Sequence, residues 1–175
     1  GIRPAAESYE FLTEGGAKGF STFLSYYILS AIADGGHPER AVELMKEYYG
    51  AMLDMGATTF WEDFDPDRVK GSASLDRLPE EGEKDIHGDF GKHCYVGFRH
   101  SFCHGWSCGP VQFLIKKIGG IEILEAGCGK MRIKPVFAGF TDYRIDYPTP
   151  YGKVTIVWKD GKFDIEVPAG VELVD

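Results

Sequence analysis

The hydrophobic period of the sequence changes at Gly119-Gly120, and this change constrains the fold more than any other feature. Before it, apolar residues recur at helical spacing in three segments, at residues 20–33, 38–53 and about 104–118. After it, apolar and polar residues alternate, as in half-buried strands. Because the helices come first and the strands afterwards, we predict an α+β protein, with helices in residues 1–120 and an antiparallel β domain in residues 121–175.

The strongest strand signal is a hairpin centred on Asp160-Gly161, a pair that favours a two-residue turn. It joins two alternating runs at residues 153–158 and 162–167, and a further alternation covers residues 131–137. The residues expected to form one buried face of the hairpin are Val154, Ile156, Trp158, Phe163, Ile165 and Val167. These patterns predict antiparallel strands from about residue 121 to the end.

The first two helical segments predict an antiparallel helical hairpin. The run FSTFLSYYILSAIA, residues 20–33, is apolar on nearly every side, which favours a helix packed between neighbours. Residues 38–53 are amphipathic and begin with a proline, which the first helical turn tolerates. Gly35-Gly36 separates the two segments and predicts a short turn between them.

A third helix, which begins near His104 or Gly109 and ends at Ile118, does not complete a helical core. In a group of three helices, a helix that is apolar all round has too few neighbours to be buried on every side. Two alternatives follow for residues 1–120. Either they pack heavily on the β domain and on another copy of the chain, or the sequence is the C-terminal section of a larger helical array.

Residues 65–98 are rich in Asp, Glu, Gly and Lys and show no sustained period of either kind. A loop of this length inside a compact domain is usually functional or mobile. Asp63, Asp65 and Asp67 have the spacing that begins a calcium loop, but the glycine and distal Glu of that pattern are out of place. We therefore expect a solvated acidic loop here.

Charge and residue usage exclude several classes of partner. The formal net charge is -8, so the chain lacks the concentrated basic surface that binds nucleic acid. No apolar run approaches the ~20 residues that cross a bilayer, so we expect no membrane partner. Neither the cysteines nor the clustered histidines show the paired spacing of metal ligands, so we expect free thiols and neither metal nor cofactor. These residues are Cys94, Cys103, Cys108, Cys128, His87, His93, His100 and His104.

Two segments carry side chains from which a sugar site can be built. Residues 57–65 place the carboxylate of Glu62 beside Trp61, and a later segment places His104 and Trp106 at the entrance to the third helix. A carboxylate can act as acid or base on a glycosidic bond, an imidazole can donate to a hydroxyl, and aromatic faces pack on the C–H surface of a sugar. From the residues alone, Glu62 could also be an ordinary loop carboxylate, His104 a helix-start histidine and Trp106 a core residue.

Several motifs, in this order along the chain, resemble the C-terminal part of the α-L-rhamnosidases, family 78 of the glycoside hydrolases. The matching residues, which span roughly residues 20–170, are Ser21-Thr22-Phe23, Gly56-Ala57-Thr58-Thr59-Phe60-Trp61-Glu62, Ser101-Phe102-Cys103-His104-Gly105-Trp106, Gly109-Pro110 and Pro148-Thr149-Pro150-Tyr151-Gly152. Members of that family carry a toroid of paired helices, an (α/α)₆ barrel, followed by a small antiparallel β-sandwich. The resemblance implies that residues 1–120 are the last helices of such a toroid and residues 121–175 the sandwich.

The resemblance also implies roles for three side chains, those of Glu62, His104 and Trp61. The position of Glu62 is the family's general base, which activates water in an inverting hydrolysis, and the position of His104 contacts the rhamnose. Trp61 would help to wall the pocket, and Trp106 is a further candidate for contact with the substrate. A rhamnose-containing carbohydrate is then the expected ligand, and terminal α-L-rhamnosyl residues of glycosides or polysaccharides are the expected substrate.

The chain departs from the family pattern in its general acid. An inverting enzyme needs a second carboxyl group about 6.5–9.5 Å from the base. In the family this acid lies upstream of the base, in a motif containing Asp, Arg and Trp, and nothing before Glu62 corresponds to it. Asp76-Arg77-Leu78 lies after the base and does not take the role.

We therefore expect the chain alone to hydrolyse little or nothing. The expected partner is either a second copy of the chain, in a homo-oligomer, or the missing N-terminal part of the same enzyme. The alternative reading is a non-catalytic module that binds carbohydrate or takes part in an assembly.

Overall fold

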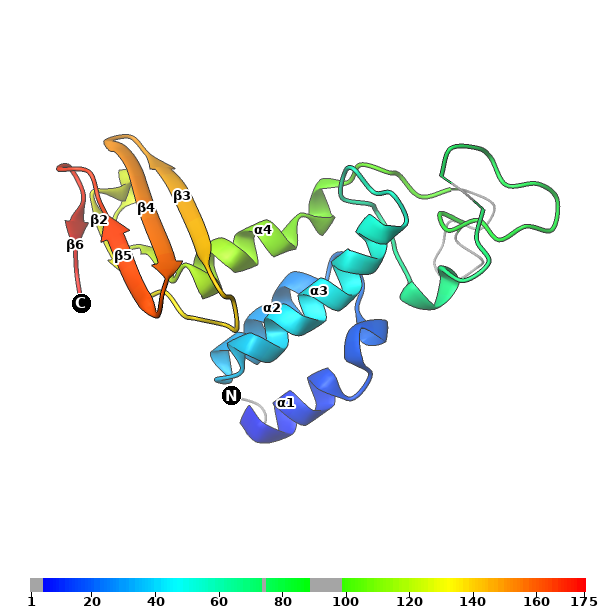
Figure 1. The fold of residues 1–175 in the computed structure, drawn as a ribbon, viewed down its shortest axis with the longest axis horizontal. Helices are drawn as coiled ribbons and strands as arrows, with labels where there is room; N and C mark the ends of the chain where they lie inside the picture. Colours follow the sequence, from blue (N-terminus) through cyan, green and yellow to red (C-terminus); the bar gives the residue numbers. More distant parts are fainter. Residues whose placement is uncertain (1–4, 74, 89–98) are drawn as a thin grey trace.

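The fold, taken from a computed structural model that describes residues 5–73, 75–88 and 99–175, consists of helices followed by strands (Figure 1). The helices are α1 (Ala5–Thr13), α2 (Ser25–Asp34), α3 (Pro38–Asp54) and α4 (Gly109–Phe113), which a π-helical turn (Leu114–Ile118) extends. Short 3-10 helices lie at Gly16–Gly19, Pro66–Arg68, Gly105–Ser107 and Ala126–Cys128. The strands are β1 (Ile121–Ile123), β2 (Lys130–Ile133), β3 (Tyr143–Thr149), β4 (Gly152–Lys159), β5 (Lys162–Glu166) and β6 (Glu172–Leu173).

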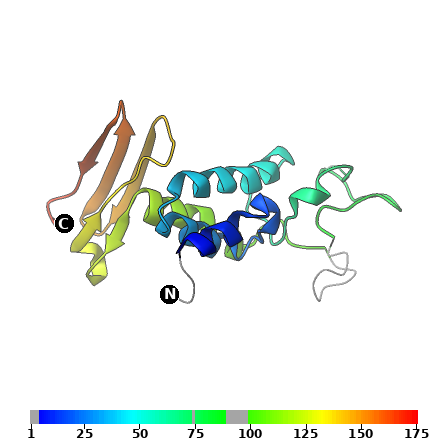
Figure 2. The same cartoon turned by 90° about the horizontal axis from the view of Figure 1, so that it is seen from below.

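These elements form three parts in a row: the sheets at one end, the helices in the middle and a long loop at the other (Figures 1 and 2). The mixed helix and strand content agrees with the α+β class predicted from the sequence. No helix in the described part of the chain has the length and apolar character needed to span a membrane.

Helices α2 and α3 form the predicted antiparallel hairpin, and α4 packs against α2. Pro38 is the first residue of α3, where its missing N–H leaves no hydrogen bond unmade. The core between the helices contains fully buried residues from all three of them, Leu29, Ile32, Leu44, Tyr48 and Phe113. The hydroxyl of Tyr48 donates to the carbonyl of Phe64, 2.6 Å away, and thereby ties the segment after α3 to this core.

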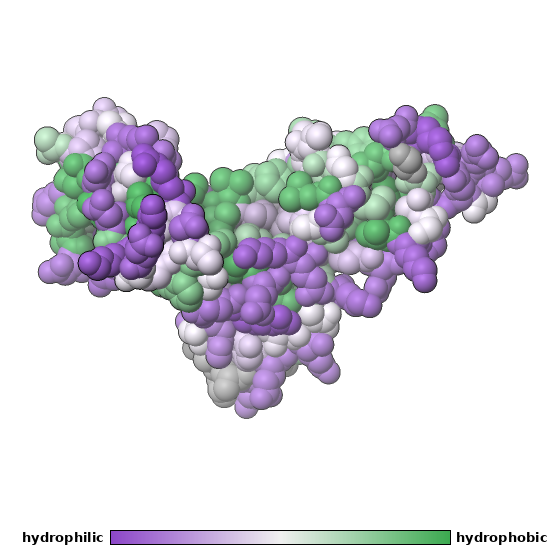
Figure 3. Space-filling model, in the orientation of Figure 1, coloured by the Kyte–Doolittle hydropathy of each residue, from purple (hydrophilic) through white to green (hydrophobic). Residues whose placement is uncertain are grey.

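Helix α2 begins at Ser25, five residues later than the apolar run predicted, because residues 22–24 form a turn. The hydroxyl of Ser21 accepts from the Leu24 N–H at 3.2 Å and closes this turn. Phe23 and Leu24 of this turn and Tyr27 of α2 are exposed, so the described part of the chain does not cover every side of this segment. Figure 3 shows hydrophobic residues gathered over the helical part, whereas the projecting loop is largely hydrophilic.

The third predicted helix is divided into three short pieces. A 3-10 turn, Gly105–Ser107, precedes α4, and a π-helical turn follows it, with the Gly119 N–H bonded to the carbonyl of Leu114 at 2.8 Å. Gly105, Gly109 and Pro110 prevent one continuous helix, because glycine disfavours helix interiors and proline cannot donate within one.

The strands form two three-stranded sheets, with the orders β1-β2-β6 and β3-β4-β5. The predicted hairpin is confirmed: β4 and β5 pair antiparallel, and the turn residues Asp160 and Gly161 both have positive φ angles, 51° and 76°. Side chains from both sheets share one core, which contains Ile121, Met131, Val154, Ile156 and Val171. The two sheets therefore pack face to face, as in a sandwich.

Two details of the β part differ from the prediction. The pair β2–β6 is parallel, because the chain returns from the second sheet and lays Glu172 and Leu173 beside Lys130 and Met131 in the same direction. The alternation predicted for residues 131–137 ends as a strand at Ile133. Pro135, two residues later, has no N–H to donate to a neighbouring strand.

The sheets and the helices are joined at the end of the π-helical turn. The Val136 N–H donates to the carbonyl of Ile118 at 2.9 Å, and the Tyr143 hydroxyl donates to the carbonyl of Val136 at 2.8 Å. Lys117 forms an ion pair with Asp34 at the end of α2, at 2.7 Å. Both backbone and charged contacts thus position the β part against the helical part.

Candidate active site

Two segments about 40 residues apart lie side by side and form the candidate site. The Glu62 N–H donates to the carbonyl of Ser101 at 2.9 Å, and the His104 N–H donates to the carbonyl of Phe60 at 2.8 Å. A third bond between the two segments runs from the Thr59 hydroxyl, which donates to the carbonyl of Phe102. These bonds bring Glu62 and His104 together, as the sugar-site hypothesis requires.

The carboxylate of Glu62 is held at one oxygen. Oε2 accepts the Ser101 N–H at 2.8 Å, and the Nδ1 atoms of His104 and His100 each lie 3.9 Å from it. Among the residues that the structure describes, Oε1 has no hydrogen-bond donor. The side chain is 18% exposed. Glu62 is thus oriented by one oxygen and keeps a second oxygen that can accept a proton from water.

The main chain of Glu62 is fixed from two other directions. Its carbonyl accepts the indole N–H of Trp106 at 2.7 Å and the hydroxyl of Thr22 at 2.5 Å. Trp106 belongs to the 3-10 turn before α4, and Thr22 to the turn before α2. Residues next to α2 and α4 therefore hold the Glu62 backbone in position, in addition to the contacts within the loop segments.

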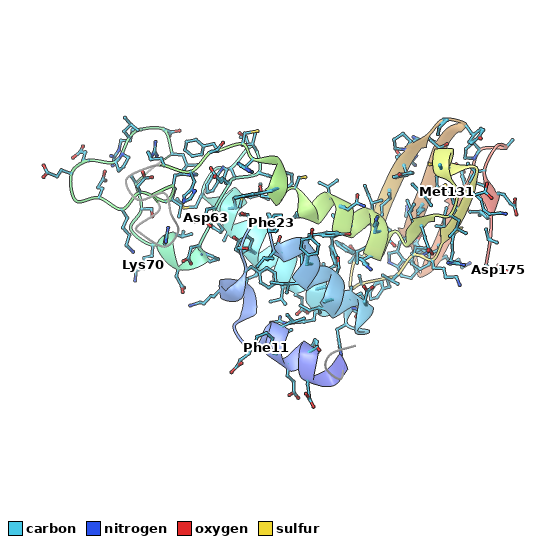
Figure 4. All side chains as sticks on the ribbon, turned by 180° about the vertical axis from the view of Figure 1, so that it is seen from behind. Phe11, Phe23, Asp63, Lys70, Met131 and Asp175 are labelled. Carbon is cyan, nitrogen blue, oxygen red and sulfur yellow. The ribbon has the colours of Figure 1, made fainter. Side chains whose placement is uncertain are left out.

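An exposed aromatic surface extends from the site. The Trp106 ring is 43% exposed and lies 4.2 Å from the His104 ring and 5.8 Å from the Phe23 ring, measured between centroids. Tyr27 continues this surface, with its centroid 5.9 Å from that of Phe23. Figure 4 labels Phe23 and Asp63 in this part of the molecule. The surface offers flat apolar faces beside a carboxylate.

Trp61 takes a different place from the one predicted. Its side chain is 1% exposed and packs edge to face against Phe64, His87 and Phe102. A ring this deeply buried cannot touch a sugar directly, so in this chain Trp61 supports the segment of Glu62 from below. The residue next to a candidate catalytic group is here a core residue, because consecutive side chains of an extended segment point in opposite directions.

Three contributors to the site were not assigned a role from the sequence: the Ser101 backbone, the Thr22 hydroxyl and His100. His100 is buried, and its Nε2 atom lies 3.9 Å from Oδ2 of Asp63, so its ring sits between the carboxylates of Asp63 and Glu62. A backbone amide carries no signal in a sequence. The side chains of Thr22 and His100 are of common polar types with no spacing that marks them.

A cavity of about 510 Å³ adjoins the site. Its lining is largely apolar and includes Tyr49, Met52, Phe60 and His104, but not Glu62. The structure therefore places His104 at the edge of a hollow, whereas the Glu62 carboxylate, which is 18% exposed, lies outside the lining of that hollow. Cys103 and Cys108 also line the cavity and are free thiols, as is Cys128, whereas Cys94 and His93 lie outside the described residues.

No group of three or more His, Cys, Asp or Glu side chains within residues 5–73, 75–88 and 99–175 is arranged to hold a metal ion. The described side chains at the site include a carboxylate, two imidazoles and aromatic faces.

His87 lies beneath the site and is 0% exposed, between the rings of Trp61 and Phe102. Within the part of the chain that the structure describes, neither ring nitrogen of His87 has a hydrogen-bond partner, and burial lowers the pKa of His87 from its ordinary value of 6.5 to about 4. The unfolded chain therefore binds a proton in a pH range where the folded chain does not. The stability that neutral His87 contributes is therefore fully present above pH 6.5, and it is lost as the pH decreases towards 4.

We expect the free energy of unfolding to decrease by up to about 3 kcal/mol between pH 7 and pH 4 because of this one side chain. The measurement is urea denaturation at several pH values, with a His87→Leu variant as the control. In the variant, the free energy of unfolding should depend much less on pH above about pH 4.5. Carboxyl groups with lowered pKa values, such as that of Glu83, titrate below that pH. An equal slope in both proteins would contradict the assignment.

Comparisons with known proteins concern the β part of the chain and its fold. Residues 120–174 match the family described as "Bacterial alpha-L-rhamnosidase C-terminal domain". A search of curated proteins found none that matches the chain. Among solved structures, the family 78 rhamnosidase of Bacillus sp. GL1 has the same fold, with a TM-score of 0.63 and 22% sequence identity. The match covers 94% of this chain and 16% of that protein, so the chain spans about one sixth of its length. The chain thus resembles the C-terminal portion of a family 78 α-L-rhamnosidase, by sequence over residues 120–174 and by fold over nearly all of its length.

Proposed function

We propose that this chain carries the general-base side of a site that hydrolyses terminal α-L-rhamnosyl residues with inversion. Glu62 is the base, and His104 and Trp106 contact the sugar. In this proposal the helices of residues 1–120 are the last helices of a toroid. The remainder of the toroid, and the general acid, belong to a part of the enzyme outside this sequence.

The observation that carries the proposal is the arrangement of the Glu62 carboxylate. A general base must be held in place and must still have an oxygen available to the water it activates. The Ser101 N–H fixes Oε2 at 2.8 Å, and Oε1 accepts no hydrogen bond from any other described residue. No arginine or lysine side chain in the described part of the chain forms an ion pair with Glu62, so it is not a structural carboxylate of the usual kind.

The surroundings of Glu62 suit a sugar. Trp106 presents an exposed ring and, through its N–H, fixes the Glu62 main chain, so contact with the sugar and position of the base are linked. His104 is partly exposed beside the carboxylate and has ring nitrogens that can bond a hydroxyl. Flat apolar rings with one polar edge are suited to surfaces that are partly wet.

Two measurements test the proposal. Titration with L-rhamnose, followed by NMR of the histidine and tryptophan side chains, should change the signals of His104 and Trp106 at millimolar sugar, and D-glucose should not. No response to L-rhamnose, or an equal response to D-glucose, would remove the support for a sugar site.

The second measurement addresses catalysis. The chain alone should not detectably hydrolyse a nitrophenyl α-L-rhamnoside, because inverting hydrolysis needs both a base and an acid. Hydrolysis by the pure chain that is lost in a Glu62→Gln variant would contradict this expectation and would mean that the chain supplies its own acid. Hydrolysis that persists in the variant would point to a contaminating enzyme.

A non-catalytic module is the second candidate. It is favoured by the exposed apolar residues of α2 and its preceding turn, Phe23, Leu24 and Tyr27, which a partner protein could cover. Under this alternative, Glu62→Gln would leave L-rhamnose binding unchanged, and no assembly that contains the chain would hydrolyse rhamnosides.

A further inference from the structure

A second cavity lies where the π-helical turn meets β1 and β2, at the C-terminal end of the α4 segment, whereas Glu62 contacts Trp106 just before the N-terminal end of α4. Its volume is about 720 Å³, within the range of about 300–1,000 Å³ that is usual for sites of small ligands. Its walls come from the helical segment, from β1 and β2 of one sheet and from β3 of the other. The cavity is therefore a product of the junction between the two parts of the chain.

The charge of this cavity is opposite to that of the whole protein. Lys116, Lys117, Arg132 and Lys134 line it together with one acidic side chain, Glu122, although the chain carries a formal net charge of -8. Four cations and one anion at one cavity give a local excess of positive charge, which attracts anions from solution.

Two of the four cations are already paired. Lys117 bonds both carboxylate oxygens of Asp34 at 2.7 Å, and Arg132 bonds Glu122 at 2.6 Å. Lys116 and Lys134 are exposed, and neither forms an ion pair with another described residue. These two ammonium groups are therefore available to a ligand.

The remainder of the lining is suited to a sugar ring. Ile115 and Ile123 provide apolar surface, Tyr147 provides an aromatic side chain with a hydroxyl, and Gln112 provides an amide with both donors and an acceptor. Apolar surface with a few polar groups fixes the orientation of a small polar molecule. A simple inorganic anion would leave this apolar surface unused.

From these features we infer that the cavity binds a sugar that carries a carboxylate, such as a hexuronate. Its carboxylate lies between Lys116 and Lys134, its ring lies against the isoleucines and Tyr147, and its hydroxyls bond Gln112. Hydrogen bonds between an ammonium group and a carboxylate are about twice as strong as those between neutral groups. The carboxylate therefore distinguishes this ligand from a neutral sugar.

The test uses the full chain and two sugars that differ at one carbon, D-galacturonate and D-galactose. Both are titrated at low salt while backbone amide signals are followed by NMR. D-galacturonate should shift the signals of Gln112, Ile121 and Tyr147, and D-galactose should bind at least about tenfold more weakly. Added salt should weaken the binding of the uronate, because these lysines are exposed.

Variants separate the site from a general charge effect. Lys116→Gln combined with Lys134→Gln should weaken D-galacturonate binding by about tenfold or more. Lys159→Gln, at an exposed position of β4 that does not line the cavity, is the matched control and should leave binding unchanged. All three positions are exposed, so the substitutions should not change the thermal unfolding midpoint. Measuring this midpoint therefore verifies that the variants fold.

Four outcomes would overturn the inference: no shift with D-galacturonate, an equal shift with D-galactose, an equal loss of binding in Lys159→Gln, or inorganic phosphate that binds as tightly as the uronate. The last result would mean a site for bare anions. None of these outcomes depends on Glu62 or on L-rhamnose, so the inference and the proposed function fail separately.

Discussion

Replacing Trp61 by alanine is expected to lower the free energy of unfolding by about 3 to 5 kcal/mol. The ring is 1% exposed and lies against Phe64, His87 and Phe102, with centroid distances of 5.7, 4.6 and 6.0 Å. Its removal leaves a cavity directly beneath the segment that carries Glu62. Urea denaturation followed by circular dichroism measures the change.

Trp106→Ala is the matched control, because both residues are tryptophans close to Glu62. Trp106 is 43% exposed, so its loss should cost only about 1 kcal/mol, chiefly through the hydrogen bond from its indole to the Glu62 carbonyl. The same variant should lose most of the response to L-rhamnose. If the two variants lowered stability equally, the assignment of Trp61 to the core and of Trp106 to the surface of the site would be wrong.

Gly120→Ala is expected to destabilise the protein by about 3 kcal/mol or more. Gly120 has a φ of +62°, and a Cβ atom there would lie 1.9 Å from the carbonyl oxygen of Lys134. This overlap is with backbone, which cannot rotate away. The same two residues are joined by a hydrogen bond from the Lys134 N–H to the Gly120 carbonyl, 3.0 Å long, so an added methyl group would separate the segments that connect helices to sheets.

The control for this prediction is Gly71→Ala. Gly71 also has a positive φ, +79°, but no atom lies within 4 Å of its ideal Cβ position. Its substitution should cost about 1 to 2 kcal/mol, which is the penalty of the left-handed conformation alone. Equal losses of stability at the two positions, measured by urea denaturation, would show that the close approach at Gly120 contributes nothing.

The parts of the fold that sequence patterns predicted correctly are those that depend on neighbouring residues. Helix α3 was predicted from its first proline and its apolar spacing, and it runs from Pro38 to Asp54. The β4–β5 hairpin was predicted from Asp160-Gly161, whose positive φ angles the turn requires. In both cases the decisive interactions lie within a few residues of one another, so a local pattern is sufficient.

The parts that were predicted incorrectly depend on distant segments. Strand β6 has two residues and no period of its own, and its parallel pairing with β2 follows from the packing of the second sheet on the first. The start of α2 is displaced because residues 22–24 form a turn, from which Thr22 bonds Glu62. No pattern within either segment contains this information.

For the candidate site, the sequence by itself determined which chemical groups are present: the carboxylate of Glu62, the imidazole of His104 and the indoles of Trp61 and Trp106. Only the tertiary structure decided which of them meet. The Ser101 amide and the Trp106 indole reach Glu62 across 39 and 44 residues. Trp61 turns instead into the core, because burial of its ring stabilises the fold. Local propensity acts over a few residues, whereas contacts across a closed loop form only when the whole core packs.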